Sequence, residues 1–126
     1  MAVNPTREDF KRFFEEDDGG PIVMLNLLRF RGDGGRASYE RYIEETGSLL
    51  TDGGAAVLYA GECSTSLVDG GENWDAIILV RYPSRSAFAE IIKGPAYQAV
   101  THYRTEGLEA AVLQATTPWS TAGGDA

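Results

Sequence analysis

Two short segments of this chain are apolar on both faces, and this pattern restricts the folds that it can adopt. Successive side chains of a strand point to opposite faces of a sheet. In residues 22–30 both faces are apolar, with Ile22, Met24 and Leu28 on one side and Val23, Leu25 and Leu27 on the other. Residues 74–82 repeat the pattern, with Ala76, Ile78 and Val80 opposite Ile77 and Leu79. Strands of this kind belong at the centre of a sheet whose two faces are both covered.

The other elements are arranged around these two strands in a chain of 126 residues, the size of one domain. Helical periodicity predicts helices over residues 4–18, 36–52 and 84–104. Apolar runs bounded by turn residues predict strands over residues 22–30, 55–67, 74–82 and 110–117. Residues 1–20 then form an N-terminal helical extension, residues 21–118 the folded domain, and residues 119–126 a flexible tail.

After the opening helix, this order is that of a ferredoxin-like α+β fold, a βαββαβ unit with an antiparallel sheet. Right-handed crossovers give the strand order four, one, three, two. Two helices can cover only one face of such a sheet, so the other apolar face predicts a homodimer in which a second copy covers it. The alternative is that the opening helix, with Phe10, Phe13 and Phe14, folds over that face.

Charge and composition exclude several classes of partner. The chain has 11 Lys and Arg residues against 19 Asp and Glu residues, a net charge of −8, which argues against a nucleic acid as the partner. No apolar run is long enough to span a membrane, and the N-terminus lacks the apolar core of a signal peptide, so we expect a cytoplasmic protein. One cysteine, Cys63, and one histidine, His102, are too few for the usual zinc sites, so we expect no metal.

A series of spaced motifs runs through residues 21–117: Met24-Leu25-Asn26-Leu27-Leu28-Arg29-Phe30, Tyr39 with Tyr42, Gly53-Gly54, Trp74-Asp75, Val80-Arg81-Tyr82-Pro83-Ser84, Pro95-Ala96-Tyr97-Gln98 and Arg104. Together they resemble the domain of unknown function family DUF1330, which is similar to the dimeric α/β-barrel superfamily. The resemblance implies a ferredoxin-like domain that forms a homodimer through its sheets. It implies no particular reaction, because the wider superfamily includes cofactor-free monooxygenases, lactone isomerases, haem-degrading enzymes and haem-dependent dismutases.

The predicted topology also brings polar residues to one edge of the sheet. Three chain segments meet at this edge: the end of the first strand, the start of the third strand and the end of the second helix of the unit. The residues expected at this edge are Arg29, Tyr39, Trp74, Asp75, His102 and Arg104. An arginine can hold a carboxylate or enolate, an aromatic ring can form an apolar wall, and an imidazole, which titrates near neutral pH, can carry a proton. We therefore predict a small-molecule pocket in which His102 carries the proton. Asp75 is the second candidate for this role. Alternatively, Arg29 or Arg104 forms a structural ion pair with Asp75 or Glu106, and His102 lies in solvent.

Asn26 is the polar residue in the middle of the first predicted strand, and a buried amide needs hydrogen-bond partners. It predicts either a bond to a neighbouring group or a place in the lining of the pocket, deeper in the sheet. Some haem-degrading relatives have an asparagine on the first strand with a Trp and a His elsewhere. Trp74 and His102 do not stand where that pattern would put them, so the departure argues against haem.

The segment Gly32-Asp33-Gly34-Gly35-Arg36-Ala37 matches the dinucleotide-binding fingerprint G-x-G-x-x-A, between a strand and a helix. The next two strands read as a direct hairpin, which breaks the alternation of strands and helices that such a fold requires. We therefore interpret the segment as a flexible turn and expect no cofactor.

These observations favour an enzyme that acts on a small aromatic or oxygenated acid by cofactor-independent proton transfer or oxygenation. The alternative is a non-catalytic homodimer that binds a small ligand or is associated with stress. In the first case we expect His102 and Asp75 to be catalytic, and Asn26, Arg29, Tyr39, Trp74 and Arg104 to bind the substrate.

Overall fold

The computed structural model describes residues 3–119, and its four strands form one antiparallel sheet in the order β2-β3-β1-β4. The elements are α1 (Arg7–Glu15), β1 (Ile22–Phe30), α2 (Gly35–Asp52), β2 (Ala56–Glu62), β3 (Ala76–Tyr82), α3 (Arg85–Lys93), α4 (Pro95–Gln98), α5 (Thr101–Gly107) and β4 (Leu108–Thr116). The predicted ferredoxin-like α+β fold and its strand order are confirmed. Within residues 3–119, no helix has the length and apolarity needed to cross a membrane.

The helix boundaries follow from local capping chemistry. Thr6 begins α1 with a capping box, in which its hydroxyl accepts from the amide of Asp9 and the Asp9 carboxylate accepts from the amide of Thr6. Ser84 caps α3 through a single bond, in which its hydroxyl accepts from the amide of Ala87. The single helix predicted over residues 84–104 is instead three helices, because Gly94 is extended before Pro95 and a second break follows α4.

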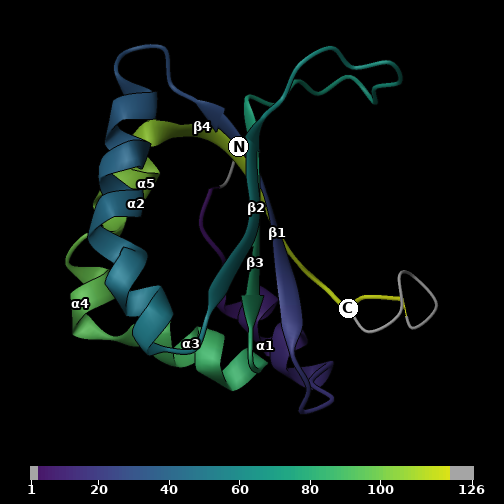
Figure 1. Ribbon diagram of the computed structural model, residues 1–126, viewed down its shortest axis with the longest axis vertical. Coiled ribbons are helices and arrows are strands. Elements are labelled where there is room, and N and C mark those ends of the chain that lie inside the picture. The colour runs from purple at the N-terminus through teal and green to yellow at the C-terminus, as the bar shows by residue number, and fades with distance from the viewer. Residues whose placement is uncertain (1–2, 120–126) are drawn as a thin grey trace.

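Helices α2 to α5 form a layer on one face of the sheet (Figure 1). Alternation along β1 points Ile22, Met24 and Leu28 at this layer, where they are buried. Ile22 and Met24 pack with Val80, Tyr82 and Phe88, while Leu28 belongs to a second core cluster with Tyr39 and Leu108. The core of the protein therefore lies between the sheet and the helices.

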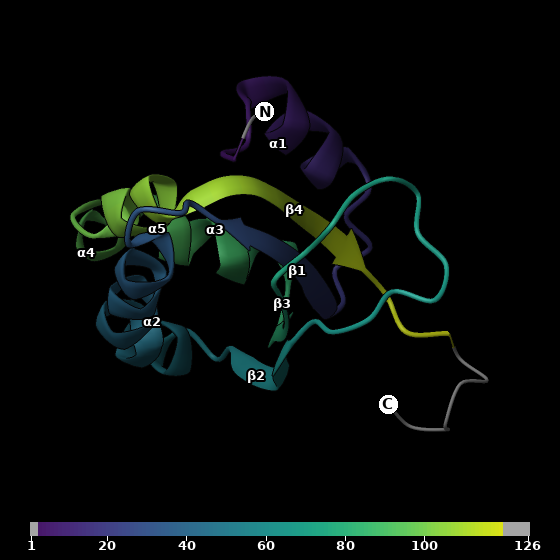
Figure 2. The same cartoon turned by 90° about the horizontal axis from the view of Figure 1, so that it is seen from above.

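The opening helix α1 joins this same side of the sheet, beside β4 (Figure 2). Phe10 and Phe13 pack against the cluster of Ile22, Met24 and Phe88, and the rings of Phe13 and Phe88 lie 5.5 Å apart between centroids. The alternative in which α1 covers the opposite face is therefore wrong, because Phe10 and Phe13 pack against the core on the helical side of the sheet.

The opposite face of the sheet, which we call the open face, carries the second apolar set. In the register of β1 and β3, Leu25 lies opposite Leu79 and Leu27 lies opposite Ile77. In the register of β1 and β4, Leu27 lies opposite Val112. No helix among residues 3–119 covers this face (Figure 2).

Candidate functional site

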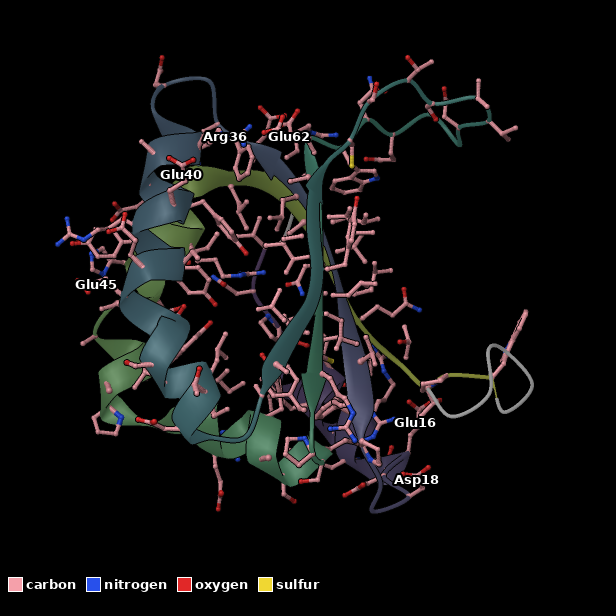
Figure 3. The ribbon with its side chains drawn as sticks, in the orientation of Figure 1. Glu16, Asp18, Arg36, Glu40, Glu45 and Glu62 are labelled. Atoms are coloured by element: carbon pink, nitrogen blue, oxygen red, sulfur yellow. The ribbon has the colours of Figure 1, made fainter. Side chains whose placement is uncertain are left out.

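A pocket of about 780 Å³ lies between the sheet and helices α2 to α5. Its walls include Leu50, Ile78 and Val80, and most of its lining is apolar. Ile43 of α2 and Val57 of β2 line it and are 47% and 56% exposed, so the pocket meets solvent between these two elements. At one end of α2 an ion pair of Arg36 with Glu62 ties the helix to β2 (Figure 3).

Two tyrosines on facing helices form a polar pair in this pocket. The hydroxyls of Tyr42 in α2 and Tyr97 in α4 lie 2.7 Å apart, and either can be the donor. Burial, together with the neighbouring Tyr97, raises the pKa of Tyr42 well above its ordinary value. Burial also raises the pKa of Tyr39 to about 12, although the positive charge of Arg104 opposes the shift. Tyr39 and Tyr42 are therefore neutral near pH 7 and can donate hydrogen bonds.

Asn26 lines the pocket from the centre of β1, where it pairs with Ile78 in β3 and Leu113 in β4. Its Nδ2 donates to the carbonyl oxygens of Met24 and Ile78, at 3.4 and 3.3 Å. These two bonds fix the amide and account for its donors. Its Oδ1 has no hydrogen-bond partner among the described residues, and it is therefore a fixed acceptor available to a ligand.

Arg104 of α5 also lines the pocket and is only 5% exposed. Its Nη1 donates to the carbonyl oxygen of Val3 and, at 3.1 Å, to Oδ1 of Asn4, while its Nη2 has no partner among residues 3–119. Within that range no carboxylate forms a salt bridge with it. A buried guanidinium held only by neutral acceptors is an unusual and costly arrangement.

Arg29 and Trp74 lie on the other side of the sheet. Alternation along β1 places Arg29 on the open face with Val23, Leu25 and Leu27. There it forms ion pairs with Glu109 at 2.8 Å and Glu72 at 3.4 Å, and its guanidinium lies 5.6 Å from the centre of the Trp74 ring. Arg29 thus forms structural ion pairs, with carboxylates other than the two considered in the sequence.

Asp75 and His102 are also outside the pocket lining. The Asp75 carboxylate accepts from the amide of Phe30 at 2.9 Å, at the end of β1. His102 is exposed on α5, with its ring 4.1 Å from that of Tyr103. The pocket lining therefore does not bring Arg29, Trp74, Asp75 and His102 together with Arg104.

Of the seven residues predicted for the site, the pocket brings together Asn26, Tyr39 and Arg104. Tyr42 and Tyr97 belong to the motifs that resemble the family, but the sequence did not predict them for the site. The spacing of Tyr39 and Tyr42 does place both on one face of α2. The pairing of Tyr42 with Tyr97 has no signal in the sequence, because it depends on the path of the chain after Gly94.

The described residues form neither a metal centre nor a nucleotide cradle. Among residues 3–119 no three His, Cys, Asp or Glu side chains are grouped so that they could hold a metal ion. The glycine-rich segment begins α2, with Gly34 at a φ of +78°, but β2 pairs directly with β3 as an antiparallel hairpin. The alternation of strands and helices that a dinucleotide fold needs is therefore broken.

Solved structures that share this fold differ widely in their sequence identity to the chain. A protein of unknown function from Rhodopseudomonas palustris is 31% identical, with a TM-score of 0.88 over 93% of this chain and 96% of the other. A dimeric protein of unknown function with a ferredoxin-like fold, from Bacteroides fragilis, is 14% identical, with a TM-score of 0.54 over 77% and 95%. A Caulobacter crescentus protein named provisionally as an antibiotic biosynthesis monooxygenase is 13% identical, with a TM-score of 0.60 over 86% and 98%.

The two distant structures share the fold alone. A comparison with curated proteins gives no match. The family model of DUF1330, a domain of unknown function, matches residues 34–116, and with the similarity to the Rhodopseudomonas protein this shows that the chain belongs to the DUF1330 family.

Proposed function

We propose that the pocket between the sheet and the helices binds a small aromatic or oxygenated acid. The observation that supports this most is the buried guanidinium of Arg104, which lines the pocket and has no carboxylate partner among residues 3–119. A ligand carboxylate makes charge-assisted hydrogen bonds that are stronger than those to Val3 and Asn4. The acid would therefore compensate the buried charge, for which Val3 and Asn4 supply only neutral acceptors.

The rest of the pocket suits the body of such a ligand. Its volume of about 780 Å³ falls within the range of small-molecule sites, and its largely apolar walls suit a ring. Asn26 Oδ1 can accept from a hydroxyl of the ligand, and the Tyr42–Tyr97 pair keeps one hydroxyl proton free to donate to an oxygen.

The reaction that we propose is cofactor-independent proton transfer or oxygenation of the bound acid. In an oxygenation, molecular oxygen would be the oxidant and the deprotonated substrate would supply the electrons. The positive charge of Arg104 would stabilise the anionic, enolate-like form of the substrate, which both reactions require. Tyr39 and Tyr42 would donate hydrogen bonds to it as neutral phenols. The provisional name of the Caulobacter protein is consistent with oxygenation on this fold, although a likeness at 13% identity supports the fold alone.

One observation favours the alternative, a non-catalytic ligand-binding or stress-associated protein. None of the described residues that line the pocket is His, Asp, Glu, Lys or Cys, the side chains that most often accept a proton in catalysis. In an enzyme, the proton would then have to leave to solvent or to the ligand's own groups.

We also propose that the protein is a homodimer joined through the open faces of two sheets. A second copy would cover the apolar residues Leu25, Leu27, Ile77 and Leu79, which no described helix covers. Sedimentation should therefore give about twice the chain mass of 13.6 kDa at micromolar concentration. A double change of Leu25 and Leu27 to Asp should produce monomers, because two unpaired charges would be placed in the interface.

Ligand-observed NMR tests the binding proposal with probes in matched pairs. Benzoate, phenylacetate and salicylate are compared with their neutral amides, which have the same shape without the charge. We expect the acids to bind and the amides to bind at least about tenfold more weakly, as the loss of a charge-assisted bond implies. Equal binding of acids and amides would reject the proposal. Oxygen uptake or exchange of ligand protons with solvent then separates the enzyme from the non-catalytic alternative.

A further inference from the structure

Two segments of the chain project from the sheet on the side of the open face. One is the loop of residues 63–75 between β2 and β3, and the other is the segment of residues 117–119 that follows β4. Both extend away from the helical layer in two perpendicular views (Figures 1 and 2). We call them the loop arm and the tail arm.

The arms carry the most exposed large hydrophobic side chains among the described residues. Leu67 and Val68 in the loop arm are each 93% exposed, and Trp119 in the tail arm is 80% exposed. Contiguous exposed apolar surface marks interaction sites, and these three side chains lie on segments that flank the apolar open face. The arms are therefore suited to contact another molecule.

The loop arm is anchored to the open face by specific contacts at its base. Arg29, which lies on that face, pairs with Glu72, donates to the carbonyl oxygen of Asn73 at 3.2 Å and stacks on Trp74. Within the arm, the amide of Gly71 donates to Asp69 and the hydroxyl of Ser66 to the carbonyl oxygen of Val68. These bonds hold the arm on the side of the sheet where a partner would sit.

The tail arm leaves the sheet at the opposite end of the strands. The base of the loop arm is close to the end of β1, because the amide of Asp75 donates to the carbonyl oxygen of Leu28 at 2.8 Å. The tail arm follows Thr116, which pairs with Val23 near the start of β1 and donates its hydroxyl to the Val23 carbonyl oxygen at 2.6 Å. A body seated on the open face is thus flanked by an arm at each end of β1.

We propose that the two arms clasp a second copy of this chain, with Leu67, Val68 and Trp119 packed against the partner subunit. The inference rests on the proposed homodimer and adds the residues that secure it. A second copy is the occupant that the open face fits best, because its own open face is equally apolar and runs over the same length of strand. In a two-fold dimer each copy gives its arms to the other, so every arm contact occurs twice.

The chain contains two tryptophans, so a Trp74→Phe variant leaves Trp119 as the only fluorescent indole. Its emission and its quenching by acrylamide are measured over a dilution series, in parallel with the sedimentation mass. We expect a shielded, blue-shifted Trp119 in the dimer that becomes exposed at the same concentration at which the mass halves. A dimer in which Trp119 stays fully accessible would overturn the proposal for the tail arm, yet leave the dimer itself intact. A monomer at every concentration would reject the homodimer as well.

The loop arm is tested by changing Leu67 and Val68 together to Ser. We expect the dimer dissociation constant to rise by at least about tenfold, as the loss of buried apolar side chains from an interface implies. Both side chains are almost fully exposed, so the fold of the subunit should be unchanged by circular dichroism. Ile43→Ser is the matched control, because Ile43 is an exposed apolar residue on the helical side and its change should leave the dissociation constant unaltered. An unchanged constant in the double variant, or an equal rise in the control, would overturn the role of the loop arm.

Discussion

Arg104 donates a hydrogen bond from Nη1 to Oδ1 of Asn4 at 3.1 Å, and so ties helix α5 to the segment that precedes α1. Asn4 returns a bond to the same helix, from Nδ2 to the hydroxyl of Thr105 at 3.3 Å. Asn4 and the adjacent Pro5 also line the pocket. The cation that we assign to the ligand carboxylate is thus held in place by the N-terminal segment.

Replacing Arg104 by Met should remove the charge while keeping the apolar part of the side chain. We expect affinity for benzoate to fall by about 10- to 100-fold, the effect of losing a hydrogen bond to a charged group. Binding of benzamide should change little. Titration followed by NMR gives both affinities. Arg29→Met is the control, since Arg29 lies on the open face, and an equal loss of benzoate binding in this control would argue against a specific role for Arg104.

The hydroxyl pair of Tyr42 and Tyr97 predicts a coupled effect on stability. Changing either residue to Phe leaves the other, part-buried hydroxyl without its partner, which costs about 1 kcal/mol. Changing both removes the two polar groups together, so the double variant should lose less than the sum of the single variants. Urea unfolding of the four proteins measures this coupling. Tyr59→Phe, at an exposed position, should be neutral, and strict additivity of the two single changes would contradict the pairing.

Buried tyrosines should make the protein sensitive to alkali. The pKa of Tyr39 is raised to about 12, and the pKa values of Tyr42 and Tyr82 are raised as well, chiefly by burial. In the unfolded chain these phenols ionise near pH 10, while the folded protein retains their protons. Stability is therefore complete below about pH 10 and declines as the pH rises towards the folded pKa values. Denaturant unfolding at several pH values should show this decline, and it should be weaker in Tyr39→Phe. An equally steep decline in that variant would exclude Tyr39 as a cause.

The fold could be predicted from the sequence because its signals are patterns among neighbouring residues. These signals are the hydrophobic periodicity of the helices and the two strands that are apolar on both faces. It also indicated that Asn26, as the polar residue in the middle of β1, would either bond to its neighbours or line a pocket, and it does both. One physical cause explains why the predicted site residues are divided between the pocket and the open face. Topology tells which ends of the elements meet, whereas the pleat decides which face each side chain takes. Arg29 and Asn26 are three residues apart, an odd number, so alternation alone would have separated them.

The other failures concern interactions that no local pattern encodes. The second break in the helical run after α4 turns α5 so that Arg104 is buried, while His102, two residues earlier, remains in solvent. The bond between Arg104 and Asn4 joins residues from opposite ends of the chain. Such contacts result from packing of the whole chain.

His102 was predicted as the proton carrier, and its exposed position now gives the opposite expectation. His102→Ala should leave the affinity for benzoate unchanged within about twofold, because the side chain does not line the pocket. NMR titration of the variant beside the original protein provides the test. A loss comparable to that of Arg104→Met would show that the imidazole reaches the ligand in solution.

Two glycines on facing helices should respond in opposite directions to the same added methyl group. Gly47 lies inside α2 with open space around it, so Gly47→Ala should stabilise the protein by up to about 1 kcal/mol through helix propensity. At Gly107, a new Cβ would lie 2.6 Å from the carbonyl oxygen of Gly35, which is backbone and cannot turn aside. Gly107→Ala should therefore force α5 away from α2 and destabilise the protein by about 1–3 kcal/mol, as overpacking usually does. Thermal unfolding of the two variants measures both effects. A Gly107→Ala protein as stable as the original would mean that the start of α2 and the end of α5 are less closely packed than the backbone contact between Gly35 and Gly107 indicates.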